Sequence, residues 1–152
     1  MKKKKAEFKI AVENRHKKIK VGKKKVKETA GAILAGMGCG SVELSILFMD
    51  DEDIRELNRE YRKKDRPTDV LSFPMREGEF GDLNPDLLGD VVISLDTAKR
   101  QAEERGETLE EEINLLLIHG ILHLLGFDHE KNAAEARRMQ AKEKGLAGLL
   151  KP

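Results

Sequence analysis

Three of the four histidines in this chain lie within one short segment, His119-Gly-Ile-Leu-His123-Leu-Leu-Gly126-Phe-Asp-His129. A spacing of four residues places His119 and His123 on one face of a helix, one turn apart. Gly126 permits a sharp exit from the helix, which can return His129 to the same point. Three neutral imidazoles leave one position of a tetrahedral zinc ion open, which is typical of catalytic sites. The sequence therefore predicts that these three histidines bind one Zn²⁺ ion.

The alternative is a set of core histidines, which is the usual explanation for a single histidine on the apolar face of a helix. Burying three imidazoles without a ligand leaves several polar nitrogens unpaired, at about 1–3 kcal/mol each. The clustering therefore favours a metal site. Imidazole also binds nickel, copper and iron, so the residues alone indicate a divalent ion rather than zinc in particular.

The histidine spacing is also the ligand framework of the metzincin peptidases, in which glutamate, the general base, follows the first histidine. This chain has Gly120 at that position. A zinc peptidase without the glutamate lacks the group that deprotonates its water. We therefore expect a metzincin-like zinc helix and treat a zinc metallopeptidase as the weaker alternative.

Two further blocks of sequence accompany the histidines. Asn58-Arg59-Glu60-Tyr61-Arg62, Asp65 and the run from Thr68 to Pro74 resemble the central motif of the bacterial YbeY family of rRNA-processing endoribonucleases. Gly89 to Ser94 resembles the third motif of that family. The blocks run in the family's order from about residue 50 to residue 130. Phe127 stands where family members usually carry tyrosine, so the ring is kept and the hydroxyl is lost.

The resemblance implies an endonuclease that cuts single-stranded RNA in the maturation of small-subunit rRNA 3′ ends and in ribosome quality control. It also implies association with ribosomal small-subunit components and with an Era-type GTPase. Among the residues, it implies functional roles for Arg59 and the three histidines. Composition and spacing establish none of these properties.

Arg59 suits phosphate chemistry because a guanidinium stays charged and binds phosphate oxygens through two hydrogen bonds. A surface residue paired with Glu56 or Glu60 is the plainer interpretation, and the family resemblance favours phosphate. Replacing Arg59 by Ala is then expected to leave the zinc content intact and to reduce RNA turnover.

Asp128 is a second candidate catalytic residue because it adjoins the ligand His129. It can orient a histidine or act on a proton. Turn formation is an equally good interpretation. Thr68 and Asp69 are candidates for anchoring a strand near the zinc, and Asp90 for fixing the loop at 75–87.

Apolar periodicity predicts strands at 6–13, 42–49, 69–73 and 88–94. It predicts helices at 20–37 and 51–61, a helix that follows Ser94 and ends at Gly106, a buried helix that ends near Gly126, and a polar helix that ends near Lys144. Capping boxes, Thr108 with Glu111 and Asn132 with Glu135, begin the last two helices. We expect Ile54, Leu57 and Tyr61 on the inner face of the second helix, and a lid or substrate-contacting flap at 75–87.

The chain has 152 residues, which suits a single domain over residues 1–152. The order of elements predicts an α+β fold with a small, mixed, mostly parallel sheet of about four strands and about five helices. The single cysteine, Cys39, excludes an internal disulfide and a cysteine-based zinc finger, and we interpret it as a small buried filler.

The net charge of +1 conceals an uneven distribution. Residues 1–27 contain thirteen Lys or Arg and two Glu, so they carry +11, and the remainder carries −10. The basic segment is either a solvated edge or a phosphate-facing patch. His16 lies among these lysines and is expected to be solvated.

No targeting segment and no run long enough to span a membrane is visible, so we expect a cytoplasmic protein. The sequence thus predicts a zinc-dependent, single-strand-specific endoribonuclease. The alternative is a ribosome-assembly factor that binds RNA, is stabilised by zinc and has no nuclease activity.

Overall fold

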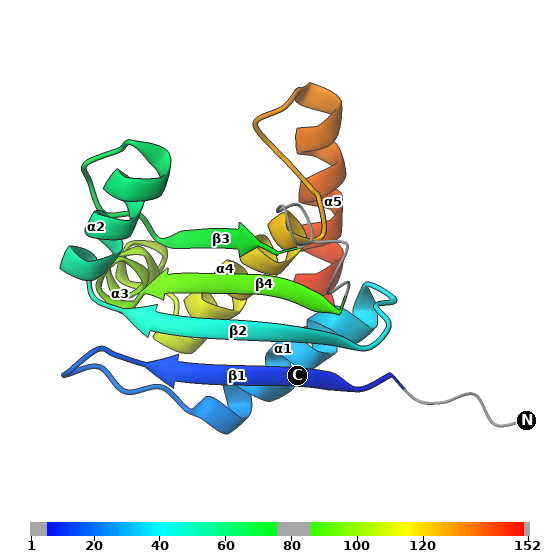
Figure 1. Cartoon of the computed structure of the whole chain (residues 1–152), viewed down its shortest axis with the longest axis horizontal. Coiled ribbons are helices and arrows are strands. Elements are labelled where there is room, and N and C mark those ends of the chain that lie inside the picture. Colours follow the sequence, from blue (N-terminus) through cyan, green and yellow to red (C-terminus); the bar gives the residue numbers. More distant parts are fainter. Residues whose placement is uncertain (1–5, 76–85, 151–152) are drawn as a thin grey trace, which may run out of the picture.

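The computed structural model describes residues 6–75 and 86–150 (Figure 1). Within these residues the strands are β1 (Phe8–Asn14), β2 (Val42–Met49), β3 (Val70–Pro74) and β4 (Leu87–Ser94). The helices are α1 (Lys23–Gly36), α2 (Asp51–Arg62), α3 (Leu95–Arg105), α4 (Leu109–Leu124) and α5 (Ala133–Leu150). No helix in this part of the chain has the length and apolar character needed to cross a bilayer.

The four strands form one sheet in the order β1-β2-β4-β3. β1 pairs with β2 and β2 with β4 in parallel, whereas β3 is an antiparallel edge strand beside β4. In Figure 1, α1 and α4 lie behind the sheet and α2 lies at the end where β2 and β4 finish. The predicted α+β class, with a mixed and mostly parallel sheet, is confirmed.

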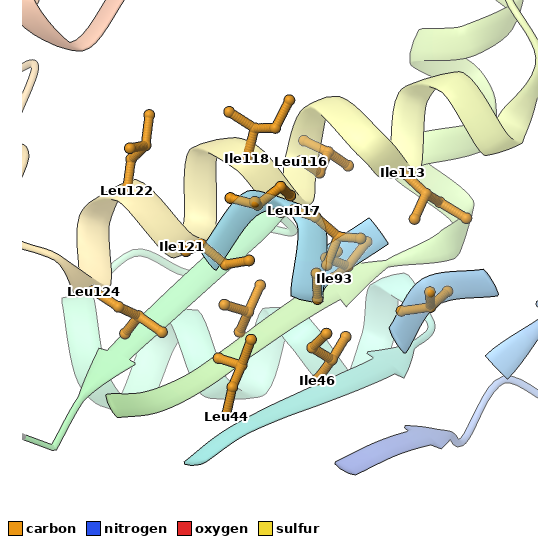
Figure 2. Packing of buried hydrophobic residues seen from close by; sticks show 14 of the residues in the cluster. Leu44, Ile46, Ile93, Ile113, Leu116, Leu117, Ile118, Ile121, Leu122 and Leu124 are labelled. Atoms are coloured by element: carbon orange, nitrogen blue, oxygen red, sulfur yellow. The ribbon is translucent and has the colours of Figure 1, made fainter. Parts of the chain in front are cut away.

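The main core lies between the sheet and the helices behind it. Leu44, Ile46 and Phe48 alternate along β2 and are buried on the helix side, as the period of a strand requires. Figure 2 shows Ile121 pointing from α4 toward this face of the sheet, whereas Leu122 points away from it. Both residues are fully buried, since α4 also contacts α1, α3 and α5. A helix that is apolar nearly all round is thus covered on all sides, as the sequence predicts.

The opposite face of the sheet is covered only in part. Ile54 of α2 packs there with Met49, Leu71 and Val92 in a second, smaller apolar cluster. Leu57 joins this cluster, but the expectation that Tyr61 faces inward is wrong, because 61% of its surface is exposed. Asn58 occupies the inner position instead and is 1% exposed.

Most predicted boundaries agree with the structure to within two or three residues. The largest difference is at α5, which continues to Leu150 because its last turns pack Leu146 into the core. Asn132 accepts a hydrogen bond from the Glu135 amide, which is the expected cap. Most of the flap predicted at 75–87 lies outside the described residues, and Leu87 already belongs to β4.

A polar network closes the sheet at the end where β1, β2 and β4 finish. Asp51 accepts hydrogen bonds from the hydroxyls of Ser94 and Thr97, each at 2.6 Å. Asp96 accepts one from the Asp51 amide, and His16 Nε2 lies 2.9 Å from the Asp96 carboxylate. The expectation of a solvated His16 is therefore wrong: its side chain is 8% exposed. Its Nδ1 accepts from the amides of residues 18 and 19, so the ring ties the segment after β1 to α3.

This network predicts a specific acid sensitivity. Burial opposes ionisation of Asp51, but hydrogen bonds from Ser94, Thr97 and Arg100 outweigh it and hold its pKa below the ordinary value. Because the folded pKa is the lower one, the stabilisation is complete above the unfolded pKa and disappears as the pH falls through the folded pKa. We expect Asp51→Asn to lower the free energy of unfolding at neutral pH, with the deficit narrowing below about pH 4.

Urea unfolding between neutral and acidic pH measures this effect. Glu56→Gln, an exposed change on the same helix, is the matched control and should follow the wild type. A deficit of Asp51→Asn that is independent of pH would contradict the electrostatic explanation.

Candidate metal centre

The three histidines meet at the carboxyl-terminal end of α4. Their ring centroids are 4.8 to 5.3 Å apart, and one nitrogen from each lies within 4.8 Å of the other two. His119 and His123 are half-buried on the helix, and His129 on the following turn is exposed. Two nitrogens bound to one zinc at about 2.0–2.1 Å lie at most about 4.2 Å apart, so a pair at the 4.8 Å limit has to move closer, by rotation of the rings, to bind a single ion.

The turn after α4 brings His129 to the other two. Gly126, with φ of 98°, donates its amide to the His123 carbonyl, and Phe127 donates to Leu122. This pair of bonds is a Schellman motif, which needs a left-handed residue at the position of Gly126. Phe127 then inserts into the core at 5% exposure, with the Arg138 guanidinium 4.4 Å above its ring. The ring therefore anchors the turn without the help of a hydroxyl group.

The chemistry of the donor set suits a divalent metal. Burial, followed by the neighbouring His119 and His129, lowers the pKa of His123 below its ordinary value. A lowered pKa keeps the imidazole neutral at physiological pH, and only a neutral imidazole can bind a metal. Among the described residues, this is the one cluster of His, Cys, Asp or Glu side chains with ligand spacing.

Gly120 lies where α4 packs against Ser72 of β3 and Val91 of β4. A Cβ atom there would lie 2.7 Å from a methyl group of Val91 and 3.3 Å from the Ser72 hydroxyl. The same hydroxyl donates a hydrogen bond to the Gly120 carbonyl at 2.9 Å. Position 120 thus faces the sheet, and no room exists there for the glutamate of a metzincin peptidase. This packing supplies a structural reason for the departure seen in the sequence.

The close approach predicts that Gly120→Ala destabilises the protein. Alanine is the better helix former, but overpacking against a buried valine typically costs about 1–3 kcal/mol. Gly145→Ala is the matched control, since a Cβ on that residue of α5 meets nothing within 4 Å. Urea unfolding should show lower stability for Gly120→Ala and a gain of up to about 1 kcal/mol for Gly145→Ala. Equal effects of the two changes would contradict the packing argument.

Glu143 approaches the metal centre from α5, with a carboxylate oxygen 3.5 Å from His119 Nδ1. A carboxylate beside the outer nitrogen of a ligating histidine orients the ring and leaves the other nitrogen free for the metal. Glu143 is not predicted from the sequence, because nothing in the spacing of residues 119 and 143 indicates that α5 folds back along α4. Only the contact between the two helices reveals it.

Replacing Glu143 by Gln tests this orienting role. We expect the affinity for Zn²⁺ to fall by about tenfold or more, as for other outer carboxylates of metal sites. Isothermal titration of the metal-free protein measures the affinity, and Glu104→Gln on the exposed side of α3 is the control. An unchanged affinity in the Glu143 variant would remove Glu143 from the metal centre.

A cavity of about 1020 Å³ opens over the histidines. Four cationic side chains line it, those of Arg62, Lys64, Arg66 and Lys131, together with the acidic side chains of Asp69, Asp128 and Glu130. Buried Asn58 donates from its amide to the Arg66 carbonyl at 2.8 Å and holds the loop after α2 in place. An ion pair of 2.8 Å between Arg55 and Asp65 holds the same loop from outside. Two helix residues therefore position the cationic loop.

The structure does not bring Arg59 to this cavity. Arg59 is exposed on α2, whereas Asn58, Tyr61 and Arg62 of the same helix line the cavity. These three residues share one face at helical spacing, and Arg59 lies one residue off that face. Asn58 sets this face because its side chain is buried, which the sequence alone does not reveal.

The three aspartates that the sequence suggests for the site each have identifiable contacts in the structure. Asp128 lines the cavity, and its side chain accepts the amide of Glu130, so it does form the turn. Asp69, at the start of β3, accepts from the Val70 amide and from Gln101, which is the anchoring role expected of it. Burial raises the pKa of Asp90, which receives a hydrogen bond from Ser45 across the open face of the sheet.

The fold and the site define the class: a small α+β protein with three histidines positioned to bind one metal ion, in a cavity lined by both cationic and acidic side chains. The sequence model of the endoribonuclease YbeY family matches residues 11–151. The chain belongs to the endoribonuclease YbeY family, whose known role is rRNA processing.

Individual relatives agree with this assignment. The endoribonuclease YbeY of Geobacter sulfurreducens is 50% identical, over 94% of this chain and 96% of that protein. The one from Aquifex aeolicus is 56% identical, over 84% of this chain and 83% of that protein. The solution structure of TM1509 from Thermotoga maritima is similar, with a TM-score of 0.61 and 31% identity over 92% of this chain and 86% of that one.

Proposed function

We propose that this chain is a zinc-dependent endoribonuclease that cuts single-stranded ribosomal RNA in small-subunit 3′-end maturation and in ribosome quality control. The observation that carries the proposal is the cluster of three imidazoles, with donor atoms within 4.8 Å of one another, in a cavity that Arg62, Lys64, Arg66 and Lys131 also line. Membership of the endoribonuclease YbeY family supports RNA as the substrate.

His119, His123 and His129 would hold the metal, and one coordination position would remain open. When bound, zinc supplies a Lewis acid that polarises a phosphoryl oxygen and lowers the pKa of water toward ~7. The buried turn at Phe127 keeps the third imidazole in place, and Glu143 keeps the first one oriented. Both contacts reduce the reorganisation needed when substrate enters.

The cationic residues that line the cavity bind the RNA backbone. Arg62 and Arg66 offer guanidinium groups that match two phosphate oxygens at once, and Lys64 adds a point charge. The role that the sequence predicts for Arg59 is better met by Arg62, which lines the cavity. Asp128 is retained as the group that accepts or delivers a proton at the scissile phosphate, because its carboxylate lines the same cavity beside His129.

The proposal extends to partners and location through the family resemblance. We infer that the protein acts in the cytoplasm, on ribosomal small-subunit components and together with an Era-type GTPase. Lysines at 17, 18, 20, 23, 24 and 27 are exposed after β1 and at the start of α1. These lysines form no ion pair among the described residues, which suits a phosphate-facing surface.

Cleavage of a labelled RNA hairpin with a single-stranded tail tests the proposal. Wild type, His123→Ala, Arg62→Ala and Arg59→Ala are purified identically, because contaminating nucleases are the main hazard. We expect cutting within the tail by wild type and none by His123→Ala. Arg62→Ala should keep its zinc and lose about 10²-fold in rate, the usual loss for one charge-stabilising donor. Arg59→Ala should lose less than Arg62→Ala.

The opposite ranking of the two arginine variants would return the phosphate role to Arg59. Equal cutting by all four proteins would mean that a contaminating nuclease cleaves the RNA. Zinc in the wild type without any cutting would favour the alternative of an assembly factor that binds RNA and does not cleave it. Cutting of an unstructured protein substrate would favour a peptidase.

A further inference from the structure

Tyr61 is an aromatic side chain that the fold leaves in solvent. It lies in the last turn of α2 and is 61% exposed, one of three large hydrophobic side chains that are exposed among the described residues. No hydrogen bond of its hydroxyl occurs within residues 6–75 and 86–150. Single exposed aromatic side chains are common on protein surfaces, so the surroundings of Tyr61 rather than its exposure alone decide what the ring can bind.

The neighbour of Tyr61 is Phe73 on the edge strand β3. The two ring centroids are 5.2 Å apart and the ring planes meet at 70°, which is an edge-to-face pair. In such a pair at most one face of either ring is covered by the other ring. At least one face of the Tyr61 ring is therefore uncovered by Phe73, and the exposed fraction indicates that this face is open to solvent.

The pair lies between two hollows of the surface. Tyr61 and Phe73 both line the cavity over the histidines. Both also line a second hollow of about 470 Å³ on the open face of the sheet, with Leu47, Leu57 and Val92. Arg62, the next residue of α2, lines the first cavity. The end of α2 thus presents a guanidinium group that can bind a phosphate, on Arg62, and an aromatic ring, on the neighbouring Tyr61.

The position of Tyr61 is not explained by packing in the apolar cluster under α2. The apolar cluster under α2 consists of Ile54, Leu71, Val92 and Met49, with Leu57, Leu47 and Phe73 at its edge. Tyr61 is not a member of that cluster. Its ring packs on Phe73 at the edge of the cluster, and the exposed part of the ring is available to a partner from outside the chain.

We propose that Tyr61, with Phe73 beside it, stacks on an unpaired base of the RNA strand whose phosphate is bound at Arg62. The inference rests on the proposed RNA substrate and adds a base-binding subsite. Any base offers a stacking face, so the contact is tolerant of sequence. A base within a duplex has both faces covered, so this subsite selects single-stranded segments at the metal centre.

The composition of the chain provides a direct probe. Tyr61 is its one tyrosine, and there is no tryptophan. The intrinsic tyrosine fluorescence of the whole protein therefore comes from position 61 alone. Stacking with a base should quench this emission in proportion to the fraction of protein that has bound.

The first experiment titrates the zinc-loaded protein with a cleavage-resistant, single-stranded 2′-O-methyl phosphorothioate oligonucleotide. Tyrosine emission and the anisotropy of a labelled oligonucleotide are followed in parallel. We expect saturable quenching with the same dissociation constant as the anisotropy change. The same oligonucleotide hybridised to its complement should quench little.

The second experiment compares Tyr61→Leu, Tyr61→Phe and Tyr61→Trp, with Leu149→Ala as a control at a residue of similar exposure, 67%. Loss of one stacked base should weaken binding and raise KM by about tenfold in Tyr61→Leu. kcat should change little in that variant. The Tyr61→Phe and Tyr61→Trp variants keep an aromatic ring, so their KM should equal that of the wild type. A purely structural role of the tyrosine hydroxyl would not allow this result.

Oligonucleotide binding without quenching, with KM unchanged in Tyr61→Leu, would overturn the subsite and leave the proposed nuclease intact. Absence of both binding and cleavage would overturn both proposals. If Tyr61→Leu fails to fold, the fluorescence of the unaltered protein and the Phe and Trp variants still decide the question.

Discussion

The close packing of α4 against β3 and β4 is the constraint on which the rest of the site depends. Gly120 lets the helix approach the sheet so that the Ser72 hydroxyl reaches its carbonyl and Val91 fills the space of a side chain. The adjacent residue, His119, is turned by the same helix toward the cavity. His123 lies one helical turn after His119 on the same face of α4. Only His129 therefore depends on the segment after the helix to reach the other two histidines.

That turn is stabilised from both sides. The backbone of Gly126 and Phe127 closes α4 with a Schellman motif, and the Phe127 ring is buried in the core. α5 then runs back along α4 and brings Glu143 to His119. The metal centre is thus built from the most buried helix and the segment after it, which suits a site whose ligands must keep their geometry.

Charge is distributed in keeping with a polyanionic substrate. The acidic side chains Asp51 and Asp96 are occupied in the network at the end of the parallel strands, where they hold α2, α3 and the segment after β1 together. The cations Arg62, Lys64 and Arg66 line the cavity, on a helix end and loop held by Asn58, and the acids Asp69, Asp128 and Glu130 also line it. Tyr61 stands between these cations and the open face of the sheet. Phosphate and base can therefore be bound by adjacent residues of one helix.

The sequence by itself indicated the three histidines as candidate metal ligands, the helix that carries two of them and the mixed sheet, because these features follow from local spacing and periodicity. It also indicated the family through contiguous motifs. The tertiary structure decided which arginine of α2 lines the cavity, because that depends on the face Asn58 buries. It also decided that His16 is buried against Asp96, 80 residues away, and that Glu143 reaches His119. Contacts between distant segments leave no periodic signal in a single sequence, since they arise only when the elements pack.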